Sequence, residues 1–203
     1  ADSNYNCCTS SGGVVALNAK SGARIWYHRV VPGNASARSD KRNGKPFYGP
    51  SGAPVWSSPT IDTKRNLLYI GTGENYTLPT THTSDAIQAI NMTTGKLVWN
   101  FQATEGDAWN MACPTIINCP GSKGRDLDFG MAPILVTGKD GKQRLVAGQK
   151  AGVIYALNPG NGKLLWKTRI GKGGALGGIH WGIAADNENV YAANADNLLA
   201  LNP

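Results

Sequence analysis

Long apolar segments are absent from this chain of 203 residues. No run approaches the ~20 consecutive apolar residues that a membrane-spanning helix needs, so we expect no membrane span. No secretory leader precedes Ala1, which indicates a processed or excised chain. The motif Cys-x-x-Cys-His does not occur, which excludes a c-type haem from this segment, and His28 and His82 lack the partner spacing of a zinc site.

Charged residues are also few, at 16% of the chain, and they leave a net charge of +7. Lys and Arg are scattered, with modest enrichment at residues 139–144 and 167–172, and no nucleic-acid-binding motif accompanies them. We therefore expect no nucleic-acid partner. A hydrophobic content of 41%, with 26 Gly and 11 Pro, is typical of a folded, turn-rich and mainly β protein.

A sequence repeat organises the chain. Residues 13–26 recur as residues 86–99 and 152–166, and each copy has an apolar segment, a turn of Asn, Ser or Thr and Gly, and a second apolar segment that ends at Trp. This pattern predicts a β-hairpin. A further strand pair is expected before each hairpin, for example at residues 67–71 and 144–148, so a period of roughly 70 residues holds about four strands.

Four strands per period predict an all-β fold of β-propeller blades. The repeats end near Trp26, Trp99 and Trp166, and a fourth copy is truncated at Pro203. We expect residues 1–203 to form one partial propeller domain of about three and a half blades, completed by sequence that this chain lacks. The three Trp side chains are predicted to pack between neighbouring blades, because a four-stranded sheet cannot bury its face alone.

The four cysteines fall into two pairs. A disulfide between the adjacent Cys7 and Cys8 would hold their Cα atoms about 3.8 Å apart, and such strain tends to mark functional sites. The alternatives are two unrelated thiols, or a separate partner for each. Cys113 and Cys119 are expected to close a small loop, with free thiols as the alternative. An even number of cysteines suits an oxidising compartment and predicts a secreted or periplasmic protein.

Several motifs together resemble the pyrroloquinoline quinone (PQQ) dehydrogenases, which are eight-bladed propellers that oxidise alcohols. The shared features are the repeat Ala-Leu-Asn-x-x-x-Gly-x-x-x-Trp, the adjacent cysteines and Gly71-Thr72-Gly73. Because propellers without a cofactor share the repeat, such as outer-membrane assembly factors, the longer motifs decide the resemblance. These resemble the polyvinyl-alcohol dehydrogenase branch, and they are Asn6-Cys7-Cys8-Thr9, residues 49–59, Asp128-Phe129-Gly130 and residues 177–182.

The resemblance implies how PQQ is bound. It places the planar quinone between a disulfide of Cys7 and Cys8 on one face and Trp56 on the other. It also places Lys150 against the quinone oxygens, where a cation stabilises the charge of the reduced cofactor. Trp181 is expected to form a wall of the same pocket. The alternatives are that Trp56 fills the core and that Lys150 is a solvated residue at the end of a hairpin.

The resemblance also implies a catalytic base and a metal. Asp107 matches the aspartate that removes the hydroxyl proton while hydride passes to the quinone, with Lys150 assisting; otherwise Asp107 is an ordinary turn residue. In related enzymes Ca²⁺ is held partly by a glutamate whose position here falls on Cys7, and a thiol is not a hard ligand. We therefore predict a Ca²⁺ site of Glu74, Asn75 and Asp107. Glu74 otherwise only shapes its turn.

The resulting hypothesis is an enzyme that uses PQQ to oxidise the alcohol groups of secondary or polymeric alcohols. Its electrons would pass to an external acceptor such as a cytochrome c. The alternative is a secreted, non-catalytic β-propeller with a binding or structural role. The cofactor content of the protein separates these two hypotheses, because an idle scaffold has no need of PQQ.

Overall fold

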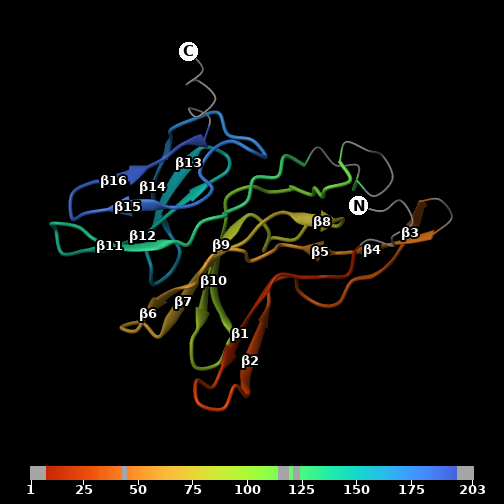
Figure 1. Ribbon diagram of the computed structural model, residues 1–203, viewed down its shortest axis with the longest axis horizontal. Coiled ribbons are helices and arrows are strands. Elements are labelled where there is room, and N and C mark those ends of the chain that lie inside the picture. The colour runs from red at the N-terminus through yellow and green to blue at the C-terminus, as the bar shows by residue number, and fades with distance from the viewer. Residues whose placement is uncertain (1–7, 43–44, 114–118, 121–123, 196–203) are drawn as a thin grey trace.

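The computed structural model describes residues 8–42, 45–113, 119–120 and 124–195, and this part of the chain is built from β-strands. Two sheets contain four strands each, and the other strands pair in twos. In Figure 1 the two four-stranded sheets lie next to each other, while β3 (Ser36–Arg42) and β4 (Lys45–Gly49) stand apart from them. Within the described residues, no helix is both long enough and apolar enough to cross a membrane.

Each four-stranded sheet is antiparallel and has the form of a propeller blade. In spatial order, the strands of the first sheet are β10 (Leu97–Gln102), β9 (Ala86–Asn91), β7 (Leu67–Gly71) and β6 (Thr60–Asp62). Those of the second sheet are β11 (Ile134–Thr137), β12 (Gln143–Gln149), β13 (Val153–Leu157) and β14 (Leu164–Arg169).

The two-stranded sheets flank these blades. They are β1 (Gly13–Leu17) with β2 (Arg24–Arg29), β5 (Ser51–Gly52) with β8 (Asn75–Thr77), β15 (Ile183–Ala185) with β16 (Val190–Ala192), and β3 with β4. The short segment at residues 72–74 joins β7 to β8, so the β5–β8 pair lies next to the end of β7 in the first blade.

The repeat forms the three hairpins that the sequence predicts, namely β1–β2, β9–β10 and β13–β14. An asparagine opens each turn, and its side-chain oxygen accepts backbone N–H bonds from the turn, as Asn91 Oδ1 does from Thr93 and Thr94. A glycine closes each turn with a positive φ, which is 70° at Gly95. The Asn of each repeat therefore stabilises the turn by accepting backbone hydrogen bonds, and the Gly allows the positive φ that the turn requires.

The repeated tryptophans join neighbouring repeats. The indole N–H of Trp26 donates to the carbonyl oxygen of Met92 at 2.8 Å, and that of Trp99 donates to Pro159 at 3.0 Å. Each acceptor lies in the hairpin turn of the next repeat. A Cβ on Gly95 would lie 2.7 Å from the ring of Trp26, so the turn packs directly on the indole. The predicted packing role is confirmed for Trp26 and Trp99.

The largest hydrophobic cluster lies between the two blades. It contains Leu67 and Tyr69 from the first sheet and Leu145 and Tyr155 from the second, with Phe129 from the segment that joins them. The rings of Phe129 and Tyr155 make an edge contact with centroids 5.6 Å apart. Because this core holds both sheets and the connecting segment, it fixes the loops that leave β7 and β12 and the loop that precedes β11.

Candidate active site

These three loops, with others at the same end of the fold, surround a cavity of about 1040 Å³. Charged side chains line part of it, and large apolar side chains line most of the rest. The charged residues are Glu74, Asp126, Asp128 and Lys150. The apolar and aromatic residues include Trp56, Trp109, Met111, Leu176 and Trp181, and Cys8 and His180 also face the cavity.

Three carboxylates meet in this cavity. Glu74, Asp126 and Asp128 are buried, and one oxygen from each lies within 4.8 Å of the others. The ammonium of Lys150 lies between the two aspartates, with Nζ 2.7 Å from Asp126 Oδ1 and 2.7 Å from Asp128 Oδ2. One cation therefore faces three acidic groups, and the cluster can accept a further positive charge.

Backbone contacts hold this cluster together, and they leave no room for a side chain at Gly73. Asp128 Oδ1 accepts the N–H of Glu74 at 3.0 Å, and the N–H of Lys150 donates to the carbonyl oxygen of Asp128 at 3.0 Å. A Cβ on Gly73 would lie 2.2 Å from Asp128 Oδ1. The Gly-Thr-Gly turn after β7 thus lets the segment with Asp128 approach closely and brings Glu74 and Lys150 together.

Burial and the neighbouring carboxylates set the electrostatics. Burial, together with its hydrogen bond to Asp128, raises the pKa of Glu74 to about 11. Burial also raises the pKa of Asp126 to about 7, against the effect of the Lys150 ammonium. For Asp128 burial acts in the same direction, but hydrogen bonding from Glu74 and the charge of Lys150 outweigh it and lower the pKa. Of the three carboxyl groups, Glu74 therefore holds its proton up to the highest pH.

Several residues that the sequence predicts for the site do meet at this cavity. Lys150 Nζ lies 5.5 Å from the centroid of the Trp56 ring, and Trp56 makes an edge contact with Trp181 at 6.2 Å between centroids. Glu74 belongs to the acidic cluster. Cys8 lines the cavity and is disulfide-bonded. Cys7 lies outside the described residues.

Asn75 and Asp107 are placed differently from the sequence prediction, because neither is among the described residues that line the cavity. The amide of Asn75 is occupied by the protein: Oδ1 accepts the N–H of Thr81 at 2.7 Å, and Nδ2 donates to the carbonyl oxygen of Ser51 at 3.0 Å. Asp107 is buried beside the loop at residues 124–128. The acidic groups beside Glu74 in the structure are Asp126 and Asp128.

No motif in the sequence gives Asp126 a role, and Asp128 stands out only as part of Asp128-Phe129-Gly130. The available signal was the spacing Asp-x-Asp directly before Phe129-Gly130, since two carboxylates near one strand end commonly converge on a cation. The backbone adds a second signal, because Asp126 has a φ of 58°, a conformation that non-glycine residues rarely adopt.

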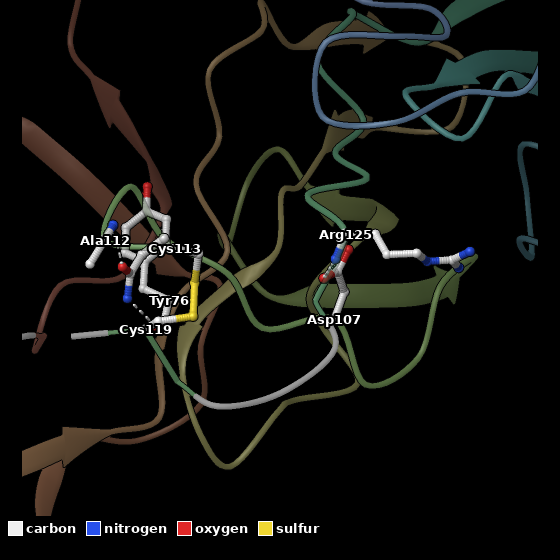
Figure 2. The surroundings of a disulfide bond; sticks show 7 residues. Tyr76, Asp107, Ala112, Cys113, Cys119 and Arg125 are labelled. Carbon is white, nitrogen blue, oxygen red and sulfur yellow. Dashed lines mark hydrogen bonds between the residues drawn. A yellow bond between two sulfur atoms is a disulfide. The ribbon is translucent and has the colours of Figure 1, made fainter. Parts of the chain in front are cut away.

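The loop between Asp107 and Asp126 carries the second cysteine pair. Cys113 and Cys119 form a disulfide with Cα atoms 4.9 Å apart, as the sequence predicts. Figure 2 shows this disulfide near Tyr76, with Asp107 and Arg125 on the other side of the same loop. Next to it, Asn110 Oδ1 accepts the N–H of Ala112, so the start of the loop is also tied internally.

Comparison with known proteins identifies the family. Residues 1–173 match the family described as PQQ, glucose/ethanol/alcohol dehydrogenase, β-propeller domain. The chain therefore belongs to this family, and the predicted β-propeller fold is confirmed.

Within this family, the chain is similar to two proteins named polyvinylalcohol dehydrogenase. Polyvinylalcohol dehydrogenase of Pseudomonas sp. is 42% identical over 193 residues, which cover 95% of this chain and 30% of the relative. Polyvinylalcohol dehydrogenase of Sphingopyxis sp. (strain 113P3) is 38% identical over 197 residues with the same coverage. Quinohemoprotein alcohol dehydrogenase from Comamonas testosteroni shares the fold, with a TM-score of 0.54 and 20% identity over 79% of this chain and 25% of that chain. The chain spans 30% of the length of the two curated relatives.

The residues at the cavity fit the cofactors of this family, which are PQQ and a calcium ion. Three carboxylates are the hard oxygen ligands that Ca²⁺ prefers. The oxygen Oε2 of Glu74 is buried and has no hydrogen-bond partner among the described residues, so a cation would satisfy it. The Trp56 ring and the Lys150 ammonium suit a planar cofactor that becomes more negative on reduction.

Proposed function

We propose that this chain is the PQQ-binding and Ca²⁺-binding part of a dehydrogenase that oxidises alcohol groups. The observation that carries the proposal is the cluster of Glu74, Asp126, Asp128 and Lys150 in one cavity with Trp56. PQQ, when bound, supplies the acceptor for the two electrons that leave the alcohol carbon. The protein supplies binding, orientation and proton transfer.

The metal ligands we propose are Glu74, Asp126 and Asp128. Glu74 and Asp128 lie on either side of the Gly73 turn, and their carboxylates are the most deeply buried of the cluster. Ca²⁺ between them would replace the proton that Glu74 holds in its absence. Lys150 then orients the two aspartates through its Nζ and remains available to the cofactor oxygens, in the role that the sequence analysis assigned to it.

The general base that we propose is Asp126, in the role that the sequence analysis gave to Asp107. The carboxylate of Asp126 lines the cavity, whereas both oxygens of Asp107 accept backbone N–H bonds. A base must come within hydrogen-bond reach of the substrate hydroxyl, and only a carboxylate at the cavity can do so. Asp126 would take the hydroxyl proton at Oδ1 or Oδ2, and Lys150 would stabilise the carboxylate before the transfer.

The substrate that we propose is a secondary alcohol or an alcohol group on a polymer. Two curated relatives are named polyvinylalcohol dehydrogenase. The apolar rim of the cavity agrees with a substrate whose carbon chain is larger than methanol, because Met111, Leu176 and Trp181 are exposed beside it. Electrons would leave to an external acceptor such as a cytochrome c. The Cys113–Cys119 disulfide supports a secreted or periplasmic location.

The test is alcohol oxidation by the intact protein loaded with PQQ and Ca²⁺, followed with an artificial electron acceptor. Asp126→Asn should lower kcat by about 10²–10⁴-fold. PQQ should remain bound, because Trp56 and Lys150 are unchanged. Asp186→Asn is the matched control, since Asp186 is a turn residue away from this cavity. Undiminished activity of Asp126→Asn would contradict Asp126 as the base, and a wild-type protein that takes up no PQQ would contradict the proposed function.

A further inference from the structure

Asp107 is a buried carboxylate that the proposed mechanism leaves without a role. It is 2% exposed, and it does not line the cavity. Oδ1 accepts the N–H of Arg125 at 2.7 Å, and Oδ2 accepts the N–H of Leu127 at 3.0 Å. Figure 2 shows the carboxylate directed at the backbone of Arg125, whose side chain points away. The Asp107 carboxylate thus binds the backbone N–H groups of the residue before Asp126 and of the residue after it.

Asp126 needs such support because of its backbone. Its φ of 58° lies in the left-handed region, which costs a non-glycine residue about 1 kcal/mol or more and persists only where the surroundings impose it. Of the two charge-assisted bonds, the one from the N–H of Leu127 fixes the peptide plane that follows Asp126, and the one from the N–H of Arg125 holds the peptide plane before Arg125. The backbone is thus held one residue before and directly after Asp126, whose carboxylate contacts Lys150 in the cavity.

Asp107 is itself fixed to the segment that follows Glu74. The N–H of Asn75 donates to the carbonyl oxygen of Asp107 at 3.2 Å, and the N–H of Trp109 donates to the carbonyl oxygen of Asn75 at 2.8 Å. A Cβ on Gly124 would lie 2.0 Å from the carbonyl oxygen of Ala108. The segment that begins at Gly124 and leads to Asp126 is therefore in close contact with the segment that contains Asp107 and Ala108. A continuous set of contacts therefore runs from the backbone next to Glu74, through Asp107, to the backbone on both sides of Asp126.

We infer that Asp107 is a positioning residue, which sets the distance and direction of the Asp126 carboxylate relative to Glu74 and so determines the affinity of the metal site. This inference rests on the proposed function. Asp107 does not line the cavity, so it is not placed to contact a bound substrate or cofactor. Its effect passes through Asp126, in the way that outer partners of metal ligands control metal affinity.

The experiment compares Ca²⁺ binding by Asp107→Asn and the wild type, measured by titration calorimetry on the intact protein after removal of bound Ca²⁺. Asparagine has the same shape, but its amide offers only one oxygen, and its NH₂ group faces a peptide N–H. We expect Ca²⁺ affinity to fall by about 10–100-fold. In the loaded enzyme we expect kcat to fall while the KM for the alcohol changes little, since the apolar rim is unaltered.

Asp186→Asn is the matched control. Asp186 Oδ1 also accepts two backbone N–H bonds, from Glu188 and Asn189, at a turn away from the cavity. A role in folding alone would lower the thermal midpoint of Asp107→Asn and leave its Ca²⁺ affinity equal to that of the control, which would overturn the inference. If Asp107→Asn does not fold, Asp107→Glu keeps the charge, displaces the carboxylate by one methylene, and is expected to lower Ca²⁺ affinity as well.

The wild type and Glu74→Gln separate this inference from the proposed function. If the wild type binds no Ca²⁺, or if Glu74→Gln binds it equally well, the proposed metal site is wrong. If the wild type binds Ca²⁺ and depends on Glu74, but Asp107→Asn binds it with unchanged affinity, the proposed function stands and the positioning role of Asp107 is refuted.

Discussion

Replacing Asp85 by Asn should stabilise this protein at neutral pH. Asp85 is fully buried at the start of the segment that leads into β9, and neither of its carboxylate oxygens accepts a hydrogen bond among the described residues. The neighbouring hydroxyl of Ser84 donates to the carbonyl oxygen of Thr81 instead. Burial, followed by the charges of Asp107 and Asp128, raises the pKa of Asp85 well above its ordinary value. The folded protein therefore binds the proton of this carboxyl up to a higher pH than the unfolded chain does.

The sign of the pH dependence follows from the raised pKa. Below the unfolded-state pKa of about 4 both states bind the proton, and the contribution to stability is at its maximum. Between that pKa and the folded-state pKa only the folded state binds it, so stability falls by about 1.4 kcal/mol per pH unit. The loss therefore grows over the whole pH range that separates the two pKa values.

Asn has the shape of a protonated Asp, tolerates the φ of 48° at this position, and does not ionise. After allowance for a buried amide with few partners, we expect a gain of about 1–3 kcal/mol at pH 7 for Asp85→Asn. The free energy of unfolding of both proteins is measured by urea denaturation from pH 4 to pH 8. The difference should be small at pH 4 and should grow as the pH rises. A difference that does not change with pH would show that the pKa of Asp85 is not raised in the folded protein.

Three further predictions concern the site and the blade contacts. Gly130→Ala should weaken PQQ binding by more than about tenfold, because its Cβ would lie 2.4 Å from the ring of Trp56; unchanged affinity in a fluorescence titration would contradict this. Glu74→Gln should abolish the rise in thermal midpoint that Ca²⁺ produces without lowering the midpoint of the metal-free protein, since the raised pKa shows that Glu74 ionises there only at a cost. Trp99→Phe should lower the free energy of unfolding by about 1–3 kcal/mol, through the lost bond to Pro159 and lost packing, and a loss near zero would contradict the blade-joining role.

The fold was predictable because its determinants are local and repeated. The Asn and Gly of each turn have a fixed backbone role, and the Trp side chains of the first two hairpins bind the next turn, so three copies of one pattern identify three hairpins. The β5–β8 pair was not predictable in this way. Its strands are short, and they pair across a long separation in sequence that no repeat reveals.

The site was only partly predictable, for a related reason. Trp56, Glu74, Lys150 and Trp181 follow recognisable motifs, and the structure places all four at one cavity. Asp126 lies in a loop whose sequence has no periodic pattern. In such a loop the sequence does not distinguish a carboxylate that binds the backbone, such as Asp107, from one that faces the cavity, such as Asp126.

The proposed function requires that this cavity hold PQQ and Ca²⁺. The most direct measurement is on the protein as isolated from its source: denaturation, extraction of small molecules, identification of PQQ by mass, and quantification of Ca²⁺ in the same sample. We expect about one PQQ and one Ca²⁺ per chain, because one cavity in the described residues is lined by the acidic cluster. Absence of PQQ, together with no uptake when PQQ and Ca²⁺ are added, would contradict it and favour a non-catalytic propeller.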